Sequence, residues 1–308
     1  MKIIGYADRF SAFPGDDVDI LVSCETPNYH ADLVQLIHGD TNPDGPGFKV
    51  QKIENTIDDD HGGRVQHIHT GSWAEVSDTE QLRFRDAFSF VTMVNPTRLA
   101  AGEQAIITKW DASREAGVGL YVNDSGCLEF RVGDGNGGAD RVSSGKALIE
   151  GIWYLAIGTY EGGKLTVRQQ PYVTRTNGRF AIASSLDSTT SLETSTTAIR
   201  PELDNGVPLR FAAHVEKTTD DLIRWVPGAL FNGKIDSPRV YATALSPDAA
   251  LSTIENPASV DGLVAAWDFE NEIGSDGIAE PRSISDSSGD GMHGTTVNMP
   301  TRAVTGYN

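Results

Sequence analysis

The sequence has few cysteines, few basic residues and no long apolar run. Its two cysteines, Cys24 and Cys127, are too few for a disulfide scaffold, and spacing alone does not pair them. Lys and Arg number 25 against 43 Asp and Glu, which gives a formal net charge of −18. No cluster of Lys or Arg is present to neutralise phosphates. We therefore expect no nucleic-acid partner and no association with an anionic membrane.

Targeting and membrane signals are also missing. No run approaches the roughly 18 apolar residues of a membrane span. The first nine residues lack the apolar segment of a secretory signal, because charge returns at Asp8 and Arg9. These absences predict a cytoplasmic protein.

Glycine and proline are plentiful, with 32 Gly and 14 Pro among 308 residues. Such a share is typical of many tight turns between short strands. Hydrophobic residues make up 39% of the chain, enough for a sizeable core. The composition therefore predicts an all-β protein of two domains, or one large β-domain with an appendage.

Residues 1–76 form a distinct and more acidic region, with 13 Asp and Glu against 5 Lys and Arg. Residues 18–23 and 33–38 are expected to be strands, since turn-forming residues border each run. Short strands separated by turns predict a small immunoglobulin-like β-region, or an apron of strands.

Residues 77–308 show a more regular strand pattern. Residues 88–94 form one predicted strand, and hairpins are predicted at 119–132 and 153–168. Leu128, Phe130 and Val132 share one face of their strand, with Glu129 and Arg131 on the other. The Ser/Thr-rich stretch 184–197 is interpreted as an exposed loop or ragged edge. One helix is predicted at 246–251, capped by a serine and with proline in its first turn.

Several segments resemble the laminin-G/concanavalin-like jelly roll. They are residues 88–97, the Gly-Ile-Trp-Tyr segment at 151–154 with the turn at 159–163, and residues 231–246. The Ala-Trp-Asp-Phe segment at 266–269 and the His-Gly-Thr segment at 293–295 are similar to the start of such domains, yet here they come last. The resemblance implies a jelly-roll sandwich over 77–308 that the returning segment 263–299 closes.

A second resemblance extends over the whole chain. Residues 9–22, 36–49, 175–180 and 299–308 are similar to the N,N-dimethylformamidase large-subunit family. This family hydrolyses the amide bond of small formamides with a mononuclear iron held by tyrosines and a carboxylate. In the family, those ligands belong to a separate catalytic domain that follows the β-sandwich part. The resemblance thus implies a non-catalytic region, without catalytic residues or iron of its own, that packs as a scaffold against the catalytic domain or sister subunits.

The alternative function is a stand-alone lectin-like jelly roll that binds glycan, with or without calcium. Trp110 and Trp225 stand beside charged residues and are the candidates for stacking on a sugar, although core or interface packing is the stronger interpretation of both. The oxygen-rich loop at 286–291 offers Asp286 and Asp290 as calcium ligands. Turns built on Asp and Gly account for the same residues without an ion.

Two further patterns bear on catalysis and metal binding. A jelly-roll glycosidase needs a third carboxylate after Glu202 and Asp204, but Val207 stands at that position. His67 and His69 offer two imidazoles on one strand face, an arrangement that can bind a metal or simply face solvent.

Overall fold

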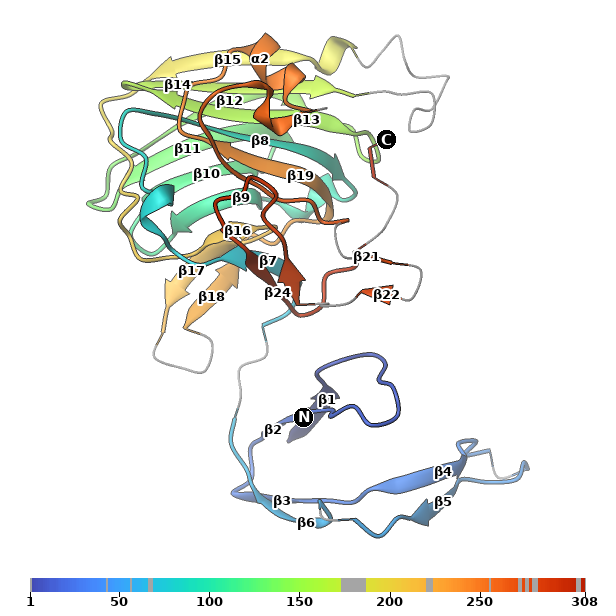
Figure 1. The fold of residues 1–308 in the computed structure, drawn as a ribbon. Helices are drawn as coiled ribbons and strands as arrows, with labels where there is room; N and C mark the ends of the chain where they lie inside the picture. The colour runs from blue at the N-terminus through green and yellow to red at the C-terminus, as the bar shows by residue number, and fades with distance from the viewer. Residues whose placement is uncertain are drawn as a thin grey trace. The chain divides into compact units, whose positions relative to one another are not determined.

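The computed structural model describes residues 2–42, 44–55, 57–65, 69–172, 187–219, 224–254, 256–270, 273–274, 277–278, 282–302 and 306–307. The chain divides into two compact units, Met1–His69 and Thr70–Asn308 (Figure 1). We call them unit 1 and unit 2. This division falls seven residues before the expected end of the N-terminal region at residue 76, because the next strand pairs within unit 2.

Unit 1 is a β-region, as expected, but the strands described in it form three separate two-stranded sheets and no packed immunoglobulin-like sandwich. Cys24 is the only buried hydrophobic side chain among the described residues of this unit. The three antiparallel pairs are β1(Ile3–Ala7) with β2(Ile20–Cys24), β3(Asn28–Ala31) with β6(Asp59–Gly62), and β4(Val34–His38) with β5(Lys49–Lys52).

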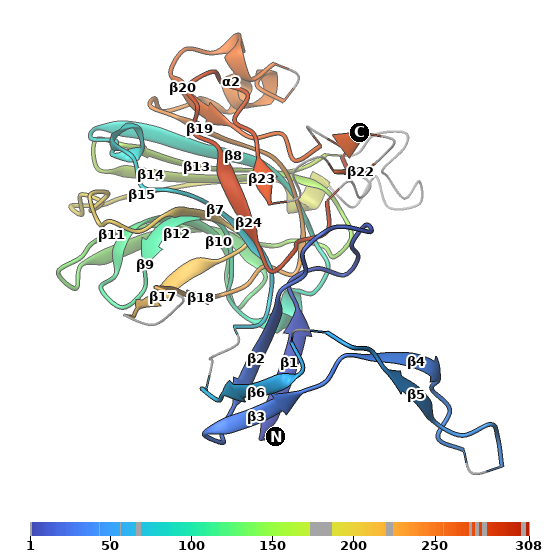
Figure 2. The same ribbon diagram turned by 60° about the horizontal axis from the view of Figure 1, so that its bottom comes forward.

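Unit 2 is a sandwich of two sheets, which Figure 2 separates into two layers. The six-stranded sheet has the order β15-β14-β13-β8-β19-β20 and consists of β8(Ala87–Pro96), β13(Tyr154–Glu161), β14(Lys164–Pro171), β15(Ser191–Thr196), β19(Gly233–Tyr241) and β20(Leu263–Ala266).

The ten-stranded sheet runs in the order β12-β11-β10-β9-β16-β7-β24-β23, with the β17–β18 hairpin joined to β9. Its strands are β7(Trp73–Val76), β9(Gln104–Asp111), β10(Ala116–Val122), β11(Cys127–Asp134), β12(Ala139–Ala147), β16(Leu209–Phe211), β17(His214–Thr218), β18(Trp225–Gly228), β23(Ser283–Ile284) and β24(Gly294–Val297). A small separate pair consists of β21(Ile273–Gly274) and β22(Gly277–Ile278).

The main core fills the space between the two sheets, because strand residues alternate between faces. Phe88, Phe90 and Val94 of β8 point into this core, whereas Val91 and Met93 belong to a second cluster on the other face of the sheet. The predicted strand face with Leu128, Phe130 and Val132 is fully buried here. The all-β sandwich predicted from the sequence is confirmed.

Helical segments are short. The predicted helix is confirmed as α2(Pro247–Ser252), whose cap residue Ser246 accepts a hydrogen bond from the backbone N–H of Ala249 at 3.2 Å. The 3₁₀ turns are η1(Glu80–Leu82), η2(Leu99–Ala101), η3(Asp187–Thr189) and η4(Pro257–Ser259). None of the helices in the described part of the chain is long and apolar enough to cross a bilayer.

The Ser/Thr-rich stretch is more ordered than a loop. From residue 187 it forms η3 and then β15, which is the edge strand of the six-stranded sheet. Only one side of an edge strand is paired, so polar residues are tolerated there. Of the two interpretations, the edge of the sheet is therefore the one that the structure supports.

The C-terminal segment contributes strands to both sheets. β20 pairs with β19 in one sheet, and β24 pairs with β7 in the other. Trp267 follows β20 directly in the sequence and is 1% exposed. Its Nε1 donates a hydrogen bond to the carbonyl oxygen of Met292 at 2.7 Å. Its ring meets Phe211 edge-on, with centroids 4.9 Å apart. This one side chain thus ties the returning segment to the core.

Replacing Trp267 with Ala should lower the free energy of unfolding of unit 2 by about 3–5 kcal/mol, because the change leaves a large cavity and an unpaired carbonyl. Urea unfolding followed by near-UV circular dichroism measures this loss. Trp225→Ala, at a partly exposed ring, is the matched control and should cost much less. A near-neutral Trp267→Ala would contradict the tying role of this residue.

Candidate functional site

The loop expected to bind calcium is organised by its own hydrogen bonds. Asp286 is buried, and its Oδ1 accepts from the backbone N–H groups of Ala266 (3.1 Å) and Ser288 (2.9 Å). Its Oδ2 accepts from the Ser288 hydroxyl (2.8 Å) and the Met292 N–H (3.0 Å). Burial raises the pKa of Asp286, but these bonds outweigh it and lower the pKa below its ordinary value. Asp290 is exposed, and calcium binding at this loop stays a prediction.

The two tryptophans considered for sugar stacking lie in different surroundings. Trp110 is only 3% exposed, which contradicts its place among the more exposed tryptophans and agrees with core packing. Its strand, β9, is joined at Asp111 by Val215 of β17. Trp225 on β18 is partly exposed, with the Arg224 guanidinium 5.1 Å from its ring centroid. His67 lies outside the described residues, and His69 is at the end of unit 1.

Trp110 instead helps to enclose a buried ion network that the sequence did not identify as a site. The Arg131 guanidinium lies 3.9 Å from the ring centroid of Tyr121 and 5.9 Å from that of Trp110. Its Nη2 donates to Glu103 Oε2 (2.5 Å) and to Glu129 Oε1 (2.7 Å). Both carboxylates bond to the same guanidinium, and Arg141 Nη1 lies 3.9 Å from Glu129 Oε1, so the group is a structural ion network rather than an acid–base pair.

A cavity of about 660 Å³ opens in unit 2 beside the start of β19. Its volume is within the usual range of small-molecule pockets. Asp236 and Glu270 provide carboxylates in its lining, and Lys234 and Arg302 provide cations. The apolar part of the lining includes Trp153, Phe211, Leu230, Phe231, Phe269 and Met299.

The two carboxylates of this cavity approach one another at Gly306. A Cβ atom built on that glycine would lie 2.8 Å from Asp236 Oδ2 and 3.3 Å from Glu270 Oε1. The two oxygens are therefore separated by no more than the sum of these distances, 6.1 Å. Burial raises the pKa of Asp236, and burial together with the charges of Asp236 and Asp268 raises the pKa of Glu270.

A β-bulge positions Asp236. The pairing of β19 with β8 shifts register between Asp236 and Arg239, and Ser237 within the bulge has a left-handed φ of 47°. Such bulges redirect side chains next to functional sites. The Ser237 hydroxyl donates to Asp236 Oδ1 at 2.9 Å, and the Thr92 hydroxyl donates to the Asp236 carbonyl oxygen at 3.0 Å. The carboxylate is thus held by the backbone geometry of the sheet.

Unit 1 exposes many large apolar side chains. Of the 17 exposed large hydrophobic side chains among the described residues, 16 lie in this unit and only Leu192 lies in unit 2. Phe10 is 94% exposed and Phe13 is 78% exposed. A soluble monomer rarely leaves so many apolar groups in water. We call this set the unit 1 apolar surface; it comprises Ile3, Ile4, Tyr6, Phe10, Phe13, Val18, Ile20, Leu33, Val34, Leu36, Ile37, Phe48, Val50, Ile53, Ile57 and Val65.

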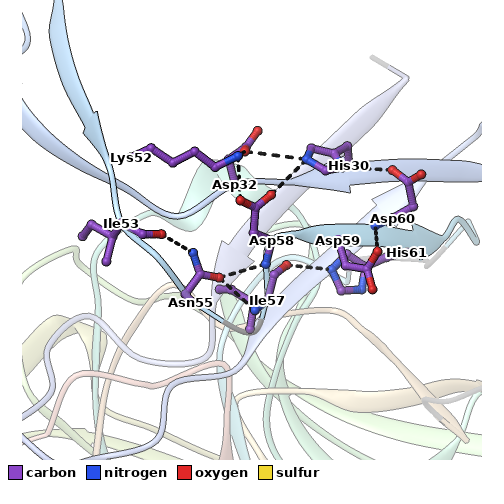
Figure 3. Close-up of polar contacts among 10 residues, drawn as sticks. All are labelled: His30, Asp32, Lys52, Ile53, Asn55, Ile57, Asp58, Asp59, Asp60 and His61. Carbon is purple, nitrogen blue, oxygen red and sulfur yellow. Dashed lines mark hydrogen bonds and ion pairs between the residues drawn. The ribbon is translucent and has the colours of Figure 1, made fainter.

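Charges rather than a core connect strands in unit 1. In Figure 3, His30 lies between carboxylates: Nδ1 is 2.9 Å from Asp60 Oδ1, and Nε2 is 3.1 Å from Asp58 Oδ1. Lys52 Nζ lies 2.8 Å from Asp32 Oδ1 and 2.6 Å from Asp58 Oδ2. We call these five residues the His30 cluster, which links β3, β5 and β6.

The His30 cluster contains a set of donors close enough to hold a metal. One ligand atom each of His30, Asp32 and Asp58 lies within 4.8 Å of the others. The Lys52 ammonium already lies against both carboxylates, so the protein supplies the positive charge itself. The hydrogen bond to Asp60 is the main cause that raises the pKa of His30, and Asp32 and Asp58 add to it. With a carboxylate at each nitrogen, the ring is favoured as the imidazolium ion.

Comparison with known proteins identifies relatives of the whole chain. Residues 69–250 match the family model described as the concanavalin A-like lectin/glucanases superfamily. Two curated relatives are N,N-dimethylformamidase β subunits, one from Paracoccus aminophilus (37% identical) and one from Alcaligenes sp (36% identical). Each match covers 100% of this chain and 41% of the relative. The chain thus spans about two fifths of the length of these curated relatives.

Solved structures show more distant similarity. A putative carbohydrate binding protein from Bacteroides ovatus aligns with 81% of this chain and 65% of its own, at 14% identity and a TM-score of 0.48. The Ruminococcus gnavus IT-sialidase CBM40 aligns with 60% of this chain and 95% of its own, at 10% identity and a TM-score of 0.44. Similarity of this extent says nothing about ligands.

The His30 cluster should make the stability of unit 1 depend on pH. Because the pKa of His30 is raised on folding, its contribution is complete below the unfolded value of 6.5 and is lost as the pH rises through the folded value. Hydrogen exchange of the amides of β3 and β6 should accelerate beyond its intrinsic pH dependence in this window. His30→Gln should abolish that dependence, whereas His38→Gln, outside the cluster, should preserve it. Equal pH dependence in wild type and His30→Gln would refute this role.

Proposed function

The chain belongs to the concanavalin A-like lectin/glucanases superfamily, and from that premise we propose that it is a non-catalytic interaction module of an N,N-dimethylformamidase-like amide hydrolase. The observation that carries the proposal is the homology of the whole chain to about two fifths of two formamidase β subunits. Identity of 37% over this length supports a common fold and a common place in the larger protein.

The unit 1 apolar surface supports an interaction role. Isolated two-stranded hairpins are marginally stable in water, and unit 1 has three of them with one buried hydrophobic residue among its described residues. Burial of apolar area contributes roughly 25 cal/mol per Å², so a covering partner would stabilise both the contact and the hairpins. The partner in this proposal is the catalytic part of the enzyme or a neighbouring subunit.

Charge adds a constraint on that partner. Residues 1–69 contain 12 Asp and Glu against 5 Lys and Arg, so the apolar surface is set in an acidic background. A complementary face would be apolar in its centre and neutral or basic at its rim. Mutual repulsion between two acidic units disfavours pairing of unit 1 with a second copy of itself.

The amide chemistry in this proposal belongs to the part of the relatives that the chain does not match. The family resemblance implies an iron held by tyrosines and a carboxylate. The metal-donor group found among the described residues, His30 with Asp32 and Asp58, contains no tyrosine, and the Lys52 ammonium already lies against both of its carboxylates. It does not fit that iron, and no step of hydrolysis is assigned to this chain.

A lectin-like role stays a prediction. The superfamily includes lectins, but of the two tryptophans expected to stack on a sugar only Trp225 is partly exposed. The ring of Trp110 is buried against Arg131.

A hybrid protein tests the interaction role. This chain replaces the matched 41% of the Paracoccus aminophilus β subunit, and light scattering after size-exclusion chromatography measures assembly. The hybrid without further substitutions should assemble and hydrolyse formamide substrates. Phe10→Ser with Phe13→Ser, and separately Leu36→Ser, should weaken assembly at least tenfold, because polar groups there remove apolar contact area.

Leu192→Ser is the matched control, since Leu192 is 50% exposed and Leu36 is 59% exposed. It should leave assembly unchanged. Binding of a fluorescent apolar dye to the isolated chain provides a readout that does not need the hybrid: the Phe10 and Phe13 substitutions should reduce it. Assembly of the Phe10/Phe13 variant equal to that of the hybrid without further substitutions would rule out this surface as the interface.

A further inference from the structure

We propose that the cavity lined by Asp236, Glu270 and aromatic side chains, here called the Asp236 cavity, binds a small organic cation with an apolar body, such as an aryl- or alkylammonium ion. The site lies entirely within unit 2 and uses none of the unit 1 apolar surface. It therefore goes beyond the interaction role and does not depend on it.

Two neighbouring carboxylates mark one end of the site. Their oxygens Asp236 Oδ2 and Glu270 Oε1 lie at most 6.1 Å apart, and within the described part of the chain no Lys, Arg or His makes an ion pair with either. Like charges at this separation disfavour ionisation of both groups. A cation between them would relieve the repulsion and favour the charged form of both carboxylates.

Among the residues that the structure describes, donors already bond to Asp236, whereas Glu270 is free to bond to a ligand. Asp236 accepts hydrogen bonds from the Ser237 hydroxyl and from the backbone N–H of Tyr307. Glu270 is exposed, and no side-chain donor is bonded to its carboxylate among the described residues. An ammonium group has three donors, so it can bond to both carboxylates and keep one hydrogen for water.

Aromatic walls supply the rest of the recognition. Phe231 and Phe269 are partly buried side chains packed against the main core, and Trp153 is 4% exposed and fixed edge-on to Tyr307. Aromatic faces attract cations and also bury the apolar part of a ligand. A volume of about 660 Å³ accommodates one aromatic ring with its ammonium group and leaves room for water.

The other charged groups around the cavity do not satisfy the carboxylates. Lys234 and Arg302 also line it, and the charge of Arg239 interacts with Asp236, but none of these three described residues forms an ion pair with Asp236 or Glu270. Arg239 donates instead to the carbonyl oxygen of Ile254. Arg302 donates from Nε to the carbonyl oxygen of Phe269 and from Nη1 to that of Ser283. Asp268 adds a further negative charge beside Glu270, and the net charge of −18 attracts cations to the whole protein.

Titration calorimetry of the full chain with benzylammonium at pH 7 tests the proposal. Benzyl alcohol has the same ring without the charge and should bind at least tenfold more weakly. Glu270→Gln and Asp236→Asn should each weaken benzylammonium binding at least tenfold, because each removes one of the two charges. Glu161→Gln, an exposed acid at the end of β13 and outside the cavity, should leave the affinity unchanged.

Saturation-transfer NMR with the same compounds gives a second readout and reports which ring protons touch the protein. Unfolding midpoints that match the wild type would show that the variants are folded; Glu270→Gln, at an exposed position, carries the test if Asp236→Asn fails to fold. Equal binding of benzylammonium and benzyl alcohol, no binding of either, or full affinity in Glu270→Gln would each overturn the proposal. None of these outcomes bears on assembly through unit 1.

Discussion

The pairing of β7 with β24 is the constraint on which the sandwich depends. It joins Glu75 to Thr295, two residues from opposite ends of unit 2. The other edge of β7 pairs with β16, so the pairing connects β24 to the rest of the sheet. Without β24, β7 would expose one edge and the Trp267 side of the core would face water. The cavity beside β19 depends on this closure too, because Trp73 and Ala74 of β7 and Thr296 of β24 are part of its lining. Such non-local pairing forms only after a large cost in chain entropy, which makes folding slow.

The sequence predicts the local parts of this fold well. Alternation of apolar and polar residues identified the β10–β11 and β13–β14 hairpins, and a serine followed by proline identified the start of α2. These features depend on neighbours in sequence and on the simple need to bury one strand face. The all-β sandwich follows from their number and spacing together with the family resemblance.

The candidate sites were harder to predict because they combine residues from distant segments. Asp236 and Glu270 are 34 positions apart, and a bulge in β19 and the approach of Gly306 bring them together. Charged neighbours of Trp110 suggested exposure, yet Arg131 and Tyr121 cover its face in the folded sheet. In unit 1 the apolar residues that suggested a sandwich core remain in water, since each hairpin lacks a second layer. The pattern of apolar residues along a strand does not distinguish a face buried in a core from a face that another chain covers.

Within the described part of the chain, the β4–β5 hairpin pairs with no third strand. The outer edge of each of its strands therefore presents backbone N–H and C=O groups as a template on which an extended segment of another chain can align. Attachment of that kind takes part of its affinity from main-chain hydrogen bonds, which nearly all residues can make. The partner's sequence can then diverge widely over evolution while the mode of attachment persists, provided that it keeps apolar contacts with side chains such as Leu36 and Val50, which also set the register.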